Sequence, residues 1–192
     1  MASVRPAGVI LTGGTARGAK LLSVPGMEVR PATARVRISL FEILRSRLDG
    51  ASAVDLFAGT GSLGIEALSR GAAEAVFVET DALALRSLRE NLAALDLRSR
   101  GRILRQDAGK AIDRLARAGE RFRLIFLDPP YAGPRLPATL DALGAGTLLE
   151  PLGLVVVQHM TKAPLPDSIG VLRRVKTRRF GQTTLTFFQS AE

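Results

Sequence analysis

The sequence predicts an α/β fold: a doubly wound, mostly parallel sheet of seven strands, with a small basic β-hairpin and helix extension at its N-terminus. Two observations support this prediction. From Ala51 onward, short apolar runs alternate with helical patterns, which is typical of βαβ units. Acidic residues also follow successive apolar runs, and ligands in such sheets bind beyond the carboxyl ends of the strands.

Length and composition indicate one domain of ordinary size. The chain has 192 residues, of which 46% are hydrophobic, so it can bury a substantial core. It lacks both an apolar run of about 18 residues and the pattern of a signal peptide. The absence of cysteine excludes disulfides and thiol chemistry. A single histidine, His159, cannot form a clustered metal site, and we interpret it as structural. We expect a cytoplasmic monomer without a metal.

The basic residues are concentrated at the two ends of the chain. Residues 1–50 carry +5, residues 51–159 are neutral and residues 160–192 carry +4, which accounts for the net charge of +9. This distribution favours contact with a polyanion at both ends, although solvated surface arginines are the alternative. Membrane binding is less favoured, because no basic helix also carries a large aromatic face.

The N-terminal part is predicted to form a basic extension. Residues 8–22 suggest two short strands around a Gly13-Gly14 turn, and Pro25-Gly26 marks a loop. A helix follows, with Thr33 as its predicted N-cap. Its apolar stripe comprises Val36, Leu40, Phe41, Ile43, Leu44 and Leu48, and its other face carries Arg35, Arg37, Arg45 and Arg47. We therefore divide the chain into an extension, residues 1–32, and a main domain, residues 33–192.

Alternating elements fill the main domain. The predicted strands are 53–57, 75–79, 102–104, 122–127 and 153–158, with 171–175 and 183–188 as a closing hairpin. The predicted helices are 62–70, 82–95, 108–118 and 136–143.

The segment Asp128-Pro-Pro-Tyr131 follows the buried run 124–127. Asp128 and Pro129 each precede a proline, so both favour extended backbone, and the prolines offer carbonyls without competing N–H donors. The segment is therefore predicted to form a stiff, acceptor-rich end to its strand. An ordinary Asp-Pro turn is the alternative.

Four successive predicted strands have a carboxylate close to their carboxyl end: Asp55, Glu79, Asp107 and Asp128. Each alone could be a helix N-cap. Gly59, Gly61 and Gly64 also fit the G-x-G-x-x-G pattern of dinucleotide-binding enzymes. However, Asp55 would repel a diphosphate and attract an amine, and hydride transfer does not explain Asp128-Pro-Pro-Tyr131. S-adenosylmethionine, which carries a ribose and an ammonium group, fits the carboxylates better than a nicotinamide cofactor.

These motifs resemble those of a known family. Val54 to Gly61 is similar to motif I of class I S-adenosylmethionine-dependent methyltransferases, whose fold is Rossmann-like, and Asp128-Pro-Pro-Tyr131 is similar to motif IV of enzymes that methylate exocyclic amines of bases. More narrowly, the chain resembles the RsmD family, bacterial methyltransferases of the guanine 2-amino group in 16S ribosomal RNA. The resemblance includes residues 10–22, Glu66 to Gly71 and Gly181 with the closing strand.

The resemblance implies roles for individual residues. Asp128 and the Pro129 carbonyl would accept from the target amine and aim its lone pair at the methyl group, while Tyr131 would stack on the base. The implied cofactor-binding set is Thr33, Asp55, Ala58, Gly59, Gly61, Glu79, Thr80, Asp107, Ala108 and Asp128. The implied RNA contacts are Arg17, Lys20, Arg35 and Arg37, for which surface ion pairs are the alternative. The implied partner is 16S ribosomal RNA or the small ribosomal subunit.

One segment departs from the family pattern. Where the family has Arg-Pro-Thr-x-x-Arg-x-Arg-Glu, Ala32 and Ile38 replace the threonine and the glutamate. This segment is implied to help close the cofactor pocket. Three other functions stay open: methylation of an adenine amine in DNA or of another RNA, non-catalytic RNA binding by a paralogue, and a nicotinamide oxidoreductase.

Overall fold

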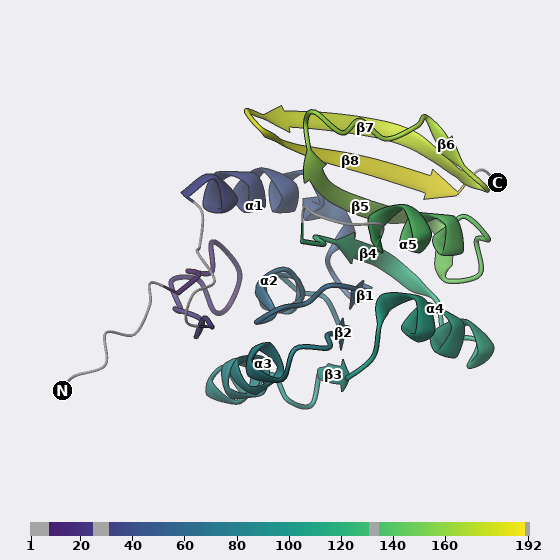
Figure 1. The fold of residues 1–192 in the computed structure, drawn as a ribbon. Helices are drawn as coiled ribbons and strands as arrows, with labels where there is room; N and C mark the ends of the chain where they lie inside the picture. Colours follow the sequence, from purple (N-terminus) through teal and green to yellow (C-terminus); the bar gives the residue numbers. More distant parts are fainter. Residues whose placement is uncertain (1–7, 25–30, 131–134, 191–192) are drawn as a thin grey trace.

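An eight-stranded sheet organises the part of the protein that the structure describes. The computed structural model describes residues 8–24, 31–130 and 135–190, and the strands follow the order β3-β2-β1-β4-β5-β8-β7-β6 (Figure 1). The first five strands pair in parallel, whereas β8, β7 and β6 pair antiparallel with their neighbours. The strands are β1 (Ser52–Asp55), β2 (Glu74–Val78), β3 (Gly101–Leu104), β4 (Phe122–Leu127), β5 (Leu149–Met160), β6 (Ser168–Ile169), β7 (Leu172–Phe180) and β8 (Thr183–Ser190).

Helices cover both faces of this sheet. They are α1 (Pro31–Ile43), the short 3₁₀ helix η1 (Arg45–Arg47), α2 (Ser62–Ser69), α3 (Ala82–Ala94), α4 (Ala108–Arg117) and α5 (Arg135–Leu143). One buried cluster packs α1, α2 and α3 against one face, and a second packs α4 and α5 against the other. Because successive strand residues point to opposite faces, alternate apolar residues of the central strands enter each cluster. Within the described ranges, no helix is long and apolar enough to cross a membrane.

The predicted fold class is confirmed, with local differences. The sheet has an eighth strand, β6, whose two residues gave no periodic signal in the sequence. Strands β5 and β7 are also longer than predicted. Helix α1 begins at Pro31, so Thr33 lies inside the helix and is not its N-cap. Proline fits the first helical position because its missing N–H has no partner there in any helix. The predicted division between residues 32 and 33 therefore falls within α1.

The N-terminal segment is less regular than the predicted hairpin. Its two arms meet in one isolated bridge between Ile10 and Lys20. Backbone hydrogen bonds from Leu11 N to Ala19 O (2.9 Å) and from Leu21 N to Val9 O hold the arms together. Most of the segment's remaining polar contacts are with α2.

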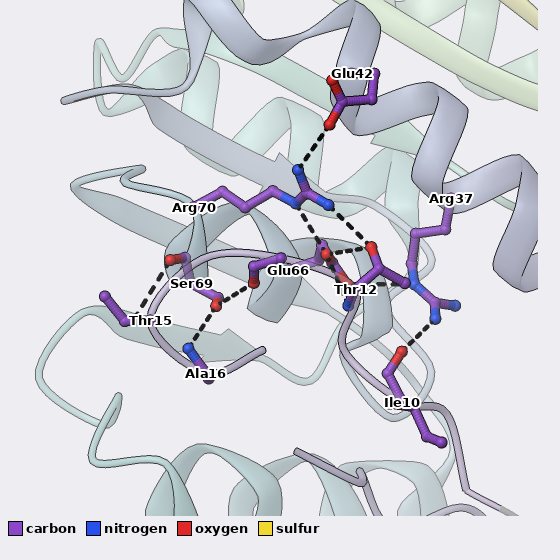
Figure 2. A network of polar contacts seen from close by, with 10 residues as sticks. Ile10, Thr12, Thr15, Ala16, Arg37, Glu42, Glu66, Ser69 and Arg70 are labelled. Carbon is purple, nitrogen blue, oxygen red and sulfur yellow. Dashed lines mark hydrogen bonds and ion pairs between the residues drawn. The ribbon is translucent and has the colours of Figure 1, made fainter. Parts of the chain in front are cut away.

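A buried carboxylate fastens the N-terminal segment to the domain. Glu66 of α2 is fully buried and accepts from the Thr12 N–H (3.0 Å) and the Thr12 hydroxyl (2.6 Å). It also pairs with Arg37 Nε at 3.3 Å and Arg70 Nε at 2.9 Å, so Figure 2 shows it lying between two guanidinium groups. Two arginines and Thr12 thus satisfy one buried carboxylate, and their contacts join the N-terminal segment, α1 and α2.

The prediction that Arg37 lies on the exposed face of its helix is wrong. Its side chain is buried, and its Nη2 donates to the Ile10 carbonyl at 2.6 Å in addition to its pair with Glu66. Residues 37, 41, 44 and 48 follow the 3–4 spacing of one helical face, so Arg37 shares the face of Phe41 and Leu44. Burial lowers the pKa of Arg37, and the neighbouring Glu66 carboxylate opposes that change. Arg37 has a structural role, and its position does not suit an RNA phosphate.

Gly64 allows α2 to approach the sheet closely. A Cβ built on Gly64 would lie 2.3 Å from a ring carbon of Phe77 on β2, and Phe77 is itself fully buried. We expect Gly64→Ala to lower the free energy of unfolding by about 1–3 kcal/mol through overpacking. Urea unfolding measures this loss. Ser99→Ala, at an exposed site, serves as the control, because the glycine alternative Gly119 has a positive φ that alanine tolerates poorly. Equal stability of Gly64→Ala and Ser99→Ala would contradict the prediction.

Candidate active site

Four carboxylates lie along the carboxyl edge of the parallel strands. Since β3, β2, β1 and β4 are consecutive neighbours, the residues at their ends follow the same order: Asp107, Glu79, Asp55 and Asp128. Asp128 and Glu79 both act electrostatically on Asp55. The sequence placed these residues at strand ends, and the strand order brings them to one edge.

Asp55 is a buried carboxylate with spare acceptor capacity. Its exposed fraction is 2%, and its Oδ2 accepts from the Gly64 N–H at 3.3 Å. Its Oδ1 is buried without a hydrogen-bond partner among the described residues. Burial, followed by the proximity of Asp128, raises the pKa of Asp55 to about 7, although N–H groups of Gly64 and Phe57 oppose the rise. A cationic donor beside Oδ1 would satisfy this atom and favour the ionised form.

The glycine loop after β1 has the backbone shape that only glycine adopts readily. Gly59 and Gly61 have φ of 54° and 94°, in the left-handed region. A Cβ on Gly59 would meet nothing within 4 Å, so open space adjoins the backbone there. By contrast, a Cβ on Gly61 would lie 2.5 Å from a Leu88 methyl group. Gly59 thus leaves room for a ligand, and Gly61 permits packing against α3.

Glu79 is held at the edge of the sheet by backbone amides. Its Oε2 accepts from the Gly59 N–H at 2.8 Å, and its Oε1 accepts from the N–H groups of Thr80 (2.6 Å) and Asp81 (2.8 Å). These bonds fix the carboxylate beside the glycine loop. Its Oε2 accepts only the bond from Gly59, so this oxygen retains one acceptor position for a ligand hydroxyl.

Asp128 is oriented by a residue that the sequence did not single out. Gln158 of β5 donates from Nε2 to Asp128 Oδ1 at 2.9 Å, and Gln158 is nearly buried. Pro129 is buried, and Pro130 is exposed. Tyr131 lies outside the described residues. The amide of Gln158 fixes the direction in which Asp128 presents its carboxylate.

The remaining predicted cofactor residues occupy different environments. Asp107 is exposed and caps α4, where it accepts from the Gly109 N–H at 3.0 Å. Asp107 is therefore a helix N-cap, which was the alternative interpretation of the four carboxylates. Ala108 is buried beside it, and Ala58 is buried in the glycine loop. Thr80 is exposed, and the side chain of Thr33 lies outside the described residues.

Arg17, Lys20 and Arg35, three of the four predicted RNA contacts, are exposed. The fourth, Arg37, is buried. In the described parts of the chain, no group of three or more His, Cys, Asp or Glu side chains could hold a metal ion.

His159 has a structural environment. Its Nδ1 faces the carbonyls of Met160 (3.1 Å) and Ala163 (3.0 Å), and its Nε2 lies 2.8 Å from the Thr186 hydroxyl. Two carbonyls at Nδ1 favour the tautomer with the proton on that nitrogen. Burial lowers the pKa of His159, so the neutral ring is favoured.

Asn91 is a further residue that the sequence did not reveal. It is buried on α3, where its Nδ2 donates to the Thr60 carbonyl at 2.9 Å and to the Leu22 carbonyl at 3.2 Å. Its Oδ1 accepts from the Leu22 N–H at 2.7 Å. It therefore ties the N-terminal segment to the glycine loop. The available signal was a polar residue between Leu88 and Leu92 on an apolar helix face.

The site suits S-adenosylmethionine. Oδ1 of Asp55, which has no partner among the described residues, matches an ammonium donor. The space at Gly59 matches close backbone approach, and Oε2 of Glu79 retains an acceptor position for a ribose hydroxyl. Together with a parallel sheet covered on both faces, these features define a class I S-adenosylmethionine-dependent methyltransferase.

Comparisons with known proteins give the family. Residues 9–189 match the family model described as "Conserved hypothetical protein 95". The chain is 36% identical to YlbH of Bacillus subtilis over 176 residues, covering 92% of this chain and 96% of YlbH. It is 35% identical to Ribosomal RNA small subunit methyltransferase D of Escherichia coli K12, covering 81% and 77% of the two chains. The chain belongs to this family, the RsmD family of methyltransferases.

Solved structures agree on the fold. The structure of yhhF from Escherichia coli matches with a TM-score of 0.83 and 32% identity, and the match covers 95% of this chain and 97% of yhhF. A Thermus thermophilus 16S rRNA N2 G1207 methyltransferase, solved with AdoMet and guanosine, matches with a TM-score of 0.73 over 96% of this chain and 50% of that one. At 23% identity, the latter likeness concerns the fold alone.

Proposed function

We propose that this protein transfers a methyl group from S-adenosylmethionine to the exocyclic 2-amino group of a guanine in 16S ribosomal RNA. The observation that carries the proposal is the position of Asp128, which directly follows β4, lies beside Asp55 and is oriented by Gln158. The name of the Escherichia coli relative, a small-subunit ribosomal RNA methyltransferase, supports the choice of RNA.

Two acceptors would hold the target amine. S-adenosylmethionine supplies an electrophilic methyl group when it is bound. The lone pair of an aromatic amine is delocalised into its ring, so the amine is a weak nucleophile. Asp128 and the Pro129 carbonyl would each accept an N–H of this amine, which aims its lone pair and stabilises the positive charge that develops on nitrogen. Tyr131 would stack on the base once the base leaves its own stack.

The other carboxylates would hold the cofactor. Asp55 and the backbone of residues 58–61 would bind the methionine part, and Glu79 the ribose. Asp107 and Ala108 would lie against the adenine edge, with Thr80 and Thr33 completing the site. Arg17, Lys20 and Arg35 are proposed to contact RNA phosphates, because all three are exposed and basic. A cytoplasmic location, a monomeric state and the division into an extension and a main domain stay predictions.

The substrate test uses labelled S-adenosylmethionine with three acceptors: small ribosomal subunits, naked 16S RNA and duplex DNA. We expect label in RNA, and mapping of the modified base should give an N2-methylguanine. Label confined to DNA adenine would overturn the guanine assignment. Failure to label any acceptor, with the cofactor bound, would favour the non-catalytic alternative.

Cofactor binding should release a proton from Asp55. With a pKa of about 7, this carboxyl is largely protonated at a pH of about 6, and a bound ammonium group lowers its pKa. We therefore expect affinity for S-adenosylmethionine to rise with pH up to about 7. Titration calorimetry at a pH of about 6, below the usual pKa of an α-amino group, should give binding heats that differ between buffers of different ionisation enthalpy. Asp55→Asn should remove this difference, and equal heats for the unmodified protein would contradict the prediction.

A further inference from the structure

Strand β7 presents an unusually basic surface at one end of the sheet. Its sequence, Leu172-Arg-Arg-Val-Lys-Thr-Arg-Arg-Phe180, contains five basic residues and no acidic one, and residues 173–179 are all exposed. The neighbouring strand β6 pairs only with Leu172 and Arg173. From residue 174 onward, β7 is therefore the edge of the sheet, and Figure 1 shows it on the far side from β3.

The basic residues of β7 fall into two groups. Arg173 donates to the Gly170 carbonyl at 2.6 Å, and Arg174 pairs with Asp167, so both have partners at the start of the strand. The side chains of Lys176, Arg178 and Arg179 form no hydrogen bond or ion pair with the residues that the structure describes. Among those residues, nothing neutralises the three cations in the second half of the strand.

The second half of β7 lies toward the carboxyl end of the parallel strands, where Asp128 also lies. Phe180 at the end of β7 pairs with Thr183, and Thr183 pairs with Met160 at the end of β5. Strand β7 therefore runs in the same direction as β4 and β5, and its last residues lie toward the carboxyl edge. Arg178 and Arg179 consequently lie at the same end of the strands as the candidate active site.

The register also places Lys176 and Arg178 on the face of the sheet to which Gln158 projects. Residues paired across strands project to the same face of a sheet. Arg178 pairs with Leu185, which pairs with Gln158, the residue that donates to Asp128. Lys176 pairs with Phe187, which belongs to the same buried cluster as Leu185. Arg179 pairs with Thr184 and so projects to the opposite face.

The separation suits a short stretch of RNA. Three neighbour steps lead from β4 through β5 and β8 to β7, which corresponds to about 14 Å at about 4.8 Å per step. A stacked strand advances about 3.4 Å per nucleotide, so this separation spans about four nucleotides. We propose that Lys176 and Arg178 bind phosphates of the RNA strand about four nucleotides from the methylated base. This inference rests on the proposed RNA substrate.

Protection of the edge is the alternative, because charged residues on an edge strand prevent pairing with another chain. A protective role needs charge but no RNA. The test therefore compares Lys176→Gln/Arg178→Gln with Arg89→Gln/Arg98→Gln. This second variant removes the same charge from two exposed residues near β3, at the opposite side of the sheet. Their side chains also lack partners among the described residues.

Methylation of naked 16S RNA and of small subunits is measured at several salt concentrations, with S-adenosylmethionine binding as the control for folding. We expect Lys176→Gln/Arg178→Gln to raise KM for RNA about tenfold at low salt and leave kcat and cofactor affinity unchanged. The dependence of log affinity on log salt should become less steep by about 1.4 for two lost contacts. The Arg89→Gln/Arg98→Gln variant should match the unmodified protein.

Several outcomes would overturn this inference. If the unmodified protein methylates RNA and the two variants have the same KM and salt dependence, β7 does not bind RNA although the proposed function stands. A loss confined to small subunits, with naked RNA unaffected, would point to an acidic ribosomal protein as the partner instead. If the unmodified protein neither binds nor methylates RNA, both the proposed function and this inference fail.

Discussion

Asp128→Ala should lower kcat for methyl transfer by about 10³-fold while S-adenosylmethionine still binds. The carboxylate is proposed to accept an N–H of the target amine where positive charge develops, and removal of one such group costs about 10²–10³ in rate. The amine would then be held only by the Pro129 carbonyl, so its lone pair would be aimed less well at the methyl group, which adds to this effect. The measurement is single-turnover transfer at saturating RNA and cofactor.

Cofactor affinity provides the second readout for this variant. Asp128 is one of the causes that raise the pKa of Asp55. Its removal lets Asp55 ionise more readily but also deletes one carboxylate of the implied cofactor-binding set. Because these two effects oppose each other, the affinity for S-adenosylmethionine should change little near neutral pH. The control is Asp113→Ala, an exposed carboxylate on α4, which should leave kcat unchanged. Normal turnover by Asp128→Ala would refute the proposed role in holding the amine.

Glu66→Gln should lower the free energy of unfolding by about 3–5 kcal/mol, because removal of one partner leaves buried charges uncompensated. Arg37 is buried and depends on Glu66 for its ion pair, and Arg70 is only slightly exposed. For a protein of this size the loss corresponds to a decrease in Tm of about 10 °C. Thermal unfolding followed by circular dichroism measures it.

The chain offers a matched control for Glu66. Glu90 forms a pair of the same i,i+4 spacing with Arg86 at 3.0 Å, but both side chains are largely exposed. Exposed pairs contribute about 0.2–1 kcal/mol, so Glu90→Gln should shift Tm by little. Similar shifts for the two variants would mean that the Glu66 network does not stabilise the fold. A large shift for Glu66→Gln alone would confirm that the N-terminal segment is fastened through this carboxylate.

Local sequence patterns were sufficient for most of the fold. The run 122–127 forms β4 with the predicted bounds, and Ser62, Ala82 and Ala108 begin their helices as predicted. These elements obey periodicity and capping rules that depend on neighbours in the sequence. Strand β6 escaped prediction because two residues carry no period.

The same local rules did not predict the environments of three polar residues whose partners are distant in the sequence. Arg37 was assigned to an exposed face because a charged residue is usually solvated, but Glu66, which is 29 positions away, neutralises it. Gln158 acquires its role from Asp128, 30 positions earlier, and Asn91 from Leu22 and Thr60. No local pattern marks a polar residue whose partner lies on another element.

The sequence by itself determined the class of fold, the glycine loop, and the placing of Asp55, Glu79, Asp107 and Asp128 at the ends of strands. Only the tertiary structure decided that β1 lies between β2 and β4, which puts Asp55 beside both Glu79 and Asp128. It also decided that Asp55 is buried with one oxygen that has no partner among the described residues, and that the end of β7 lies at the carboxyl end of the sheet, as the site does. The reason is physical: strand order, burial and register follow from packing between distant segments, whereas turns and helix starts follow from adjacent residues.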